Sequence, residues 1–174
     1  MFAIENLVRD SEVGWMLTDP VQVPMFNTRW AFALDNYYPR SKTEFEQVID
    51  NFLQLQSDDL AAANSFIFQY YQDTLEDLDA DEIAELTPID SAEQVRQFIE
   101  LAGNPLVQRR DADGLLYVSL DFKCDWNADH GLQIVFREGK ALCKVGEYDS
   151  HLTNSDAYDD AAFEDRIYVP MSEL

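Results

Sequence analysis

Apolar residues follow three successive patterns along the chain: short alternating runs, then helical spacing, then alternating runs again. In the first 38 residues, the runs Val13–Leu17 and Val21–Phe26 predict strands on either side of a turn at Thr18–Pro20. Pro24 has no backbone N–H to donate, so the second run is expected at a sheet edge. The segment Trp30–Leu34 fits either a further strand or the start of the helices.

The middle of the chain predicts about three helices. The first follows a capping box at residues 41–46, and its apolar stripe ends at Leu53. The second starts near residues 58–59 and carries a stripe that reaches Leu78. The third, Ser91–Ala102, begins with a capping box and ends at Gly103, which is followed by Pro105.

The last part of the chain predicts an antiparallel meander, because alternating runs are separated by turn residues. Its strands are expected at Leu106–Arg109, Leu115–Phe122, Leu132–Arg137 and Ala141–Val145, with turns at Asp111–Gly114 and Glu138–Gly139 and a closing strand at Ile167–Val169. The predicted architecture is α+β in one domain, residues 1–174: an antiparallel sheet of N-terminal strands and C-terminal meander, with a block of about three helices.

Charge restricts the choice of partner. The 174 residues include 34 acids and 12 bases, which gives a net charge of −22. Such a surface repels nucleic acid and anionic membranes, so neither is expected as a partner. No apolar run reaches the ~18 residues of a membrane span, and Glu5 interrupts the start of the chain where a signal peptide needs apolar residues. We therefore expect a cytoplasmic protein.

The acids are concentrated in the predicted helices. Between Thr43 and Val95 there are 14 acids and no base. Acids at the end of the second helix oppose its dipole, which suggests a use other than stability. We expect this face to bind a basic protein partner, although the acids could also serve solubility alone. The candidate partner-binding residues are Asp58, Asp59, Asp73, Glu76, Asp77, Asp79, Asp81, Glu82 and Glu85.

Both cysteines and both histidines of the chain fall within 28 residues, as Cys124, His130, Cys143 and His151. Cysteine and histidine are the usual zinc ligands, but these four lack the close pairs of a zinc signature. We therefore expect no metal and no cofactor. The alternative is a small enzyme or metal-binding protein that uses the region of Cys124 and His130.

The most distinctive segment is Asp125-Trp-Asn-Ala-Asp-His-Gly-Leu132, between two predicted strands. With Tyr117–Leu120, Gly139 and Gly146-Glu-Tyr-Asp149, it resembles a family of small bacterial proteins of unknown function, over residues 88–149. The signature of that family is Trp-Asp-x-Glu-His-Gly-Leu, and this chain has Asn127 and Asp129 at the two acid positions. The resemblance implies an immunity protein, encoded beside a secreted antibacterial toxin.

Two roles for this motif are open. In a catalytic role, His130 would form an acid–base pair with Asp129 or Asp125. In a structural role, Trp126 would fill the end of the core, Gly131 would supply a backbone position without a side chain, and His130 and Asp125 would hydrogen-bond the loop. We favour the structural role, because adjacent side chains on an extended chain point apart. The expected function is that of an inhibitor which neutralises a cognate toxin through its acidic surface.

Overall fold

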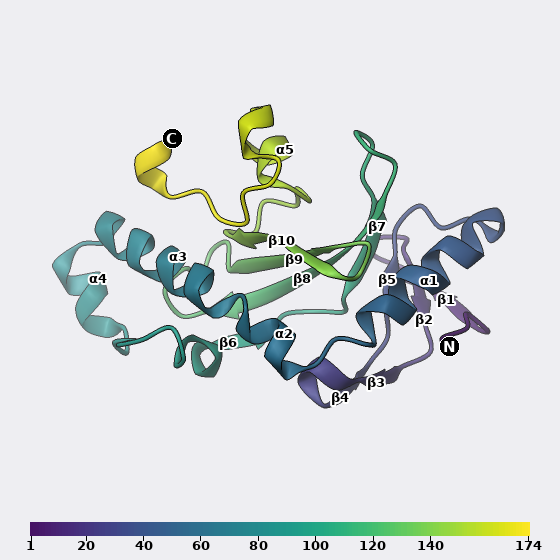
Figure 1. The fold of residues 1–174 in the computed structure, drawn as a ribbon. Helices are drawn as coiled ribbons and strands as arrows, with labels where there is room; N and C mark the ends of the chain where they lie inside the picture. The colour runs from purple at the N-terminus through teal and green to yellow at the C-terminus, as the bar shows by residue number, and fades with distance from the viewer.

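The computed structural model describes residues 1–174, and its central element is an eight-stranded sheet (Figure 1). The strand order is β1-β2-β5-β7-β8-β9-β10, and β6 also pairs with β8. The strands are β1 Leu7–Arg9, β2 Met16–Thr18, β5 Ala33–Leu34, β6 Ile99–Leu101, β7 Leu106–Arg109, β8 Leu116–Cys124, β9 Leu132–Arg137 and β10 Ala141–Gly146. All pairs are antiparallel except β5–β7. The predicted α+β class is confirmed, and one sheet joins the N-terminal strands to the meander.

Four helices lie between β5 and β6 in sequence: α1 Lys42–Phe52, α2 Ser57–Ala61, α3 Asn64–Asp77 and α4 Ala80–Glu85. The apolar stripe of α1 is buried against the sheet, as its spacing predicts. The ring of Phe52 packs edge-on against Phe32 and Phe136, with centroids 5.9 and 5.6 Å away. These contacts place α1 over the meander and bury aromatic surface from three separate segments.

The turn between β9 and β10 explains how α1 comes so close to the sheet. Glu138 and Gly139 both have positive φ, 51° and 67°, as a type I′ turn requires. A Cβ on Gly139 would lie 2.2 Å from the carbonyl oxygen of Val48, so only glycine fits beneath the helix. The Asn51 side-chain amide also donates to the carbonyl of Glu138 at 2.9 Å.

The third predicted helix is wrong. Residues 95–98 form a single 3₁₀ turn, and Ile99–Leu101 continues as strand β6. Ile99 pairs with Cys124 and Leu101 with Phe122 along the end of β8. Pairing with β8 satisfies the backbone of this segment, and that tertiary interaction outweighs a helical pattern of only three turns. The second predicted helix is divided instead into α2 and α3.

The N-terminal strands belong to two sheets. β2 pairs with β1 and β5, whereas β3 (Val21–Val23) pairs with β4 (Thr28–Trp30) in a separate two-stranded sheet. The turn predicted at Thr18–Pro20 therefore connects two sheets rather than the arms of one hairpin. Pro24 ends β3 and begins a 3₁₀ turn. The segment Trp30–Leu34 contains the end of β4 and all of β5.

The C-terminal segment, residues 147–174, crosses the face of the sheet opposite α1 (Figure 1). It contains α5 (Asn154–Tyr158) and short 3₁₀ turns. Ile167–Val169 is not a strand, although the backbone N–H of Val145 donates to the carbonyl of Ile167 at 2.7 Å. A small cluster of Tyr117, Val135, Cys143 and Leu152 lies beneath it, separate from the main core.

One main hydrophobic cluster extends from Ile4 to Tyr168 and includes residues of both sheets and of α1, α2 and α3. None of the helices combines the length and the apolar composition that crossing a membrane requires.

Candidate functional site

Trp126 anchors the motif loop, residues 125–131, to helix α3. The indole is only 3% exposed, and its ring makes edge contacts with Tyr70 and Tyr71 at centroid distances of 6.2 and 5.6 Å. The indole N–H is buried without a hydrogen-bond partner, so the packing of the ring is what holds it. Trp126 thus fills the end of the core between β8 and α3.

Asn127 organises the rest of this loop. Its side-chain amide donates to the hydroxyl of Tyr70 at 2.8 Å, and that hydroxyl donates to the carbonyl of Gly131 at 2.9 Å. The side-chain oxygen of Asn127 also accepts the backbone N–H of His130 at 3.1 Å. Gly131 has a φ of 71°, and a Cβ there would lie 2.4 Å from the carbonyl oxygen of Phe122. The loop is therefore fixed by an amide and a glycine.

The hydrogen bonds expected from His130 and Asp125 are not those that hold the loop. The His130 ring is 60% exposed, and its Nδ1 lies 3.4 Å from a carboxylate oxygen of Glu147. Asp125 and Asp129 are exposed and form no hydrogen bond or ion pair with His130. The acid–base pair considered from the sequence is absent, because the loop turns these carboxylates towards solvent.

The two cysteines are buried and separate from each other. The thiol of Cys124 lies 3.7 Å from the carbonyl of Asn127, and that of Cys143 lies 3.4 Å from the carbonyl of Val135. Burial raises the pKa of each thiol to about 12, so both are protonated at neutral pH. No group of three or more His, Cys, Asp or Glu side chains is arranged to hold a metal ion.

Several candidate acids have internal roles. The carboxylate of Asp73 accepts the hydroxyl of Tyr168 at 2.6 Å. Asp79 is the N-cap of α4 and accepts two backbone N–H groups, and Glu82 completes that capping box. The Asp59 carboxylate accepts the backbone N–H of Gln56, the residue before α2. For Asp79 the argument from an unfavourable helix end is wrong, because Asp79 stabilises the start of a further helix.

The remaining candidate acids are exposed and unpaired. Asp58, Glu76, Asp77, Asp81 and Glu85 form no salt bridge, and the next base after them in sequence, Arg96, bonds instead to Ser57. We call these five residues the acidic face. Their carboxylates lie on α2, α3 and α4, and Asp77 also lines the pocket described below.

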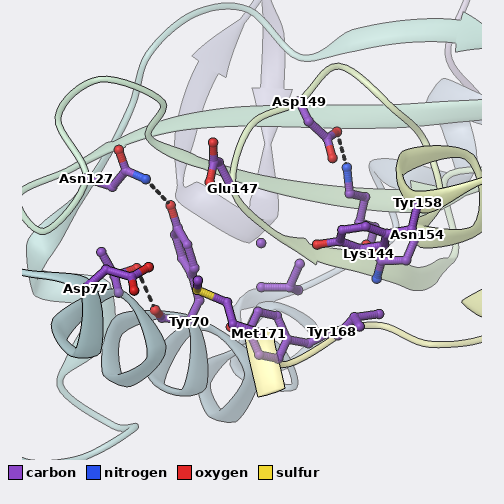
Figure 2. A pocket seen from close by; sticks show the side chains of 14 residues that line it. Tyr70, Asp77, Asn127, Lys144, Glu147, Asp149, Asn154, Tyr158, Tyr168 and Met171 are labelled. Carbon is purple, nitrogen blue, oxygen red and sulfur yellow. Dashed lines mark hydrogen bonds and ion pairs between the residues drawn. The ribbon is translucent and has the colours of Figure 1, made fainter. Parts of the chain in front are cut away.

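A pocket of about 160 Å³ opens where the C-terminal end of α3 meets the motif loop and the end of β10 (Figure 2). The C-terminal segment forms its remaining wall. Its polar and aromatic lining comprises Tyr70, Thr74, Asp77, Asn127, Lys144, Glu147, Asp149, Asn154, Tyr158 and Tyr168. The pocket therefore brings together the acidic helix, the motif and the Gly146–Asp149 segment, three features that the sequence distinguishes separately.

Lys144 is the buried cation of this pocket. Its side chain is 2% exposed, and its ammonium group forms an ion pair with Asp149 (Figure 2). It also donates to the side chain of Gln133 at 3.0 Å and to the carbonyl of His151 at 3.2 Å. The pKa of Lys144 is lowered, because burial disfavours the charged ammonium group more than the nearby Asp149 carboxylate favours it. All three N–H groups have acceptors, so none is free to bind a ligand.

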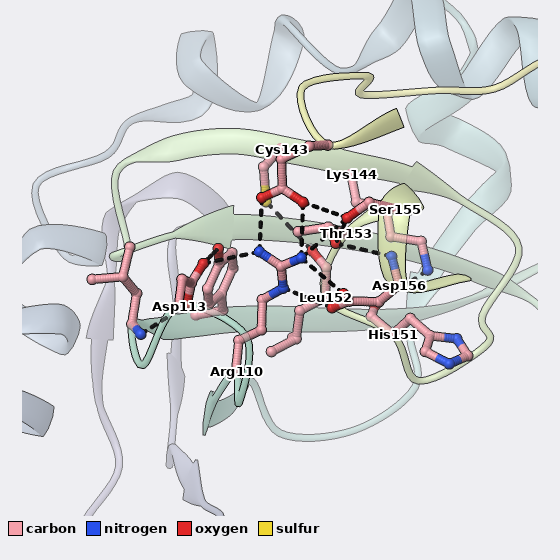
Figure 3. Close-up of polar contacts among 12 residues, drawn as sticks. Arg110, Asp113, Cys143, Lys144, His151, Leu152, Thr153, Ser155 and Asp156 are labelled. Carbon is pink, nitrogen blue, oxygen red and sulfur yellow. Dashed lines mark hydrogen bonds and ion pairs between the residues drawn. The ribbon is translucent and has the colours of Figure 1, made fainter. Parts of the chain in front are cut away.

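A second buried cation, Arg110, attaches the C-terminal segment to the sheet (Figure 3). Its guanidinium is 8% exposed and forms bidentate hydrogen bonds with Asp156, at 2.7 and 2.8 Å, and with Glu164, at 2.7 and 2.8 Å. Asp113 accepts a further bond at 3.0 Å. Hydrogen bonds from Arg110 lower the pKa values of Asp156 and Glu164, since they favour the charged form.

Sequence reasoning did not single out Lys144 or Arg110, and it named Asp149 only as the end of the Gly146–Asp149 segment, without a role. Lys144 lies in an apolar strand, and a β-bulge at Cys143 turns it towards the C-terminal segment. The only available signal was a lone lysine in a buried strand, followed five positions later by an acid. The two bidentate partners of Arg110, Asp156 and Glu164, are 46 and 54 positions away, and no local pattern identifies them.

The chain matches the family described as a domain of unknown function, DUF6985, over residues 3–152. It belongs to this family. No curated protein matches the chain, and no solved structure matches it. The matched region contains the acidic face, the motif loop and Lys144, whereas Asn154, Tyr158 and Tyr168 of the pocket lie beyond it.

Proposed function

We propose that this protein is an immunity protein, which binds a cognate antibacterial toxin and neutralises it through the acidic face. The observation that carries the proposal is the set of five exposed carboxylates on α2–α4 without a cation partner. Unpaired charges of one sign repel each other and oppose folding slightly, so a complementary surface would relieve that cost.

Charge complementarity suits the capture of a toxin. Complementary potentials steer encounter and raise association rates, up to about 10⁸–10⁹ M⁻¹s⁻¹ at low salt. A toxin that acts on nucleic acid needs a basic groove for its substrate. An acidic protein seated in that groove would exclude the substrate without any chemical step of its own.

The geometry gives less support to an enzyme. Cys124 is buried and protonated, and Lys144 has all its N–H groups bonded, so neither offers a free nucleophile. His130 lies at the surface beside Glu147. A binding role explains why the acidic face is exposed and unpaired. An enzymatic role for Cys124, Lys144 or His130 does not explain it.

The test uses the purified product of the adjacent reading frame as the partner. We expect a stable complex with an interface of about 1,600 Å² in total. A variant with Asp58→Asn, Glu76→Gln, Asp81→Asn and Glu85→Gln should associate at least about tenfold more slowly at low salt. The control carries Glu5→Gln, Glu12→Gln, Asp111→Asn and Glu138→Gln, the same charge change on other exposed residues.

The control variant should associate at close to the wild-type rate. Absence of a complex at low and moderate salt would refute the proposal. Equal slowing by both variants would show that net charge, rather than the acidic face, governs association.

A further inference from the structure

The charges around the pocket do not cancel. Lys144 is the only base in the lining, and Asp149 neutralises it within the wall. Asp77 and Glu147 then remain as carboxylates from two different parts of the lining, one at the end of α3 and one directly after β10 (Figure 2). Apart from Lys144, the nearest basic side chain to either carboxylate is the exposed His130 ring, whose Nδ1 lies 3.4 Å from a carboxylate oxygen of Glu147. The open part of the pocket is therefore negative.

The pocket also has the size and the lining for a flat organic cation. Its volume of about 160 Å³ matches the roughly 150 Å³ of an engineered cavity that accommodates benzene. Tyr70, Tyr158 and Tyr168 contribute aromatic rings to the walls. A guanidinium group stacks on aromatic faces and bonds carboxylates through several N–H groups, and both features are present here.

We propose that this pocket receives one arginine side chain of the protein partner. The proposal rests on the proposed function and adds a specific anchor to it: the acidic face attracts the basic surface, and the pocket holds a single residue of that surface. Buried arginine anchors contribute a large share of the binding energy in protein interfaces. An anion is disfavoured, because every N–H group of Lys144 already has an acceptor.

The C-terminal segment completes the pocket from outside the matched family region. Asn154, Tyr158 and Tyr168 supply one wall, and the family match ends at residue 152. Tyr158 is 42% exposed and its hydroxyl forms no hydrogen bond, so it is free to contact an incoming group. One wall of the proposed arginine site therefore comes from beyond the matched region, whereas Asp77, Glu147 and Tyr70 lie within it.

The experiment requires no knowledge of the partner. Nα-acetyl-arginine methylamide is titrated into the ¹⁵N-labelled protein, and its citrulline counterpart, which has the same shape without the charge, serves as the control ligand. We expect saturable amide shifts at Asn127, Gly146 and Glu147 with a dissociation constant of about 1–10 mM. The citrulline compound should cause at most a small fraction of these shifts, and the lysine counterpart should bind more weakly.

Variants then locate the site. Asp77→Asn and Glu147→Gln should each weaken arginine binding about threefold to tenfold, as expected for the loss of one partly exposed charge contact. Glu76→Gln and Asp81→Asn, on the acidic face but outside the pocket lining, should change it less than twofold. Equal binding of citrulline, shifts elsewhere, or unchanged affinity in both pocket variants would overturn the proposal. Partner capture by the whole protein would still test the immunity function separately.

Discussion

The hydroxyl of Tyr168 donates a 2.6 Å hydrogen bond to the carboxylate of Asp73, which lies 95 positions earlier in the chain. This bond joins the C-terminal segment to the C-terminal half of α3. Burial, followed by the adjacent carboxylate, raises the pKa of Tyr168, so the phenol remains a donor at neutral pH. An acid that the sequence assigns to partner binding thus serves the fold.

Removing this hydroxyl should destabilise the protein. Tyr168→Phe deletes a donor to a charged acceptor and should lower the free energy of unfolding by about 1–2 kcal/mol. Tyr158→Phe is the matched control, because that hydroxyl has no partner, and its effect should be below about 0.5 kcal/mol. Urea denaturation of the two variants tests the difference. Equal stability of both would show that the Asp73 bond contributes nothing.

Neutralising the acidic face should leave the fold intact. Asp58→Asn, Glu76→Gln, Asp81→Asn and Glu85→Gln remove exposed charges without salt bridges. Relief of their mutual repulsion offsets the small loss at the first turns of α2 and α4, where Asp58 and Asp81 lie, so the melting temperature should stay nearly constant. Asp79→Ala, by contrast, removes the N-cap of α4 and should cost about 1 kcal/mol. Thermal unfolding at low and high salt provides the measurement. A marked loss of stability in the fourfold variant would mean that these carboxylates support the fold.

The Arg110 cluster predicts acid sensitivity. The pKa values of Asp113, Asp156 and Glu164 are lower in the folded protein than their usual values near 4. Below about pH 4 the unfolded chain binds more protons than the folded one, so this stabilisation is present above that pH and is lost as pH falls through the folded values. Unfolding experiments between pH 7 and pH 2.5 should show the decline.

A variant isolates the contribution of Arg110. Arg110→Leu leaves carboxylates unpaired and should cost about 3 kcal/mol at pH 7, with a difference from wild type that narrows as the acids are protonated. Arg40→Gln removes an exposed charge and serves as the control. A stability difference for Arg110→Leu that stays constant from pH 7 to pH 2.5 would contradict this account.

Lys144 and Asp149 should behave as a coupled pair. Lys144→Met and Asp149→Asn each leave the other charge without its partner, and each should cost about 3 kcal/mol. The loss in free energy of unfolding of the double variant should be smaller, by at least about 1 kcal/mol, than the sum of the losses of the two single variants. Lys140→Met, at an exposed lysine without a salt bridge, is the control. Additive losses in denaturant titrations would argue against a direct pair.

The cysteines should be unreactive in the native state. Both thiols are buried with pKa values of about 12, so a thiol-disulfide reagent at pH 8 should label neither within minutes. In 6 M guanidinium chloride both should react, and Cys143→Ser should reduce the count from two to one. Rapid labelling of the folded protein would show that one thiol is accessible.

The sequence predicted the elements whose partners lie nearby along the chain. The turn at Glu138–Gly139 and the strands beside it are as expected, because a hairpin is specified by local turn residues. The helix predicted at Ser91–Ala102 was wrong, because β6 obtains its hydrogen bonds from β8, a segment no local pattern includes. Local spacing therefore predicted hairpins well and distant pairings poorly.

The same limit applies to the candidate site. The motif indicated the loop, and the base-free run indicated the acidic helix, but nothing in the spacing showed that Asn127, Asp77 and Glu147 surround one pocket. Their proximity results from the packing of α3 on β10 and from the return of the C-terminal segment. Such contacts depend on the completed fold.

The parallel pairing of β5 with β7 determines the order in which the molecule can be assembled during synthesis. Ala33 pairs with Leu106, so the N-terminal strands have no place in the sheet until about 70 further residues have left the ribosome. Synthesis adds about 5–20 residues per second, so the sheet edge formed by β1, β2 and β5 remains unpaired for several seconds. Nascent chains stalled before and after β7 should therefore differ sharply in protease resistance, with protection of the first 34 residues appearing only once β7 has emerged.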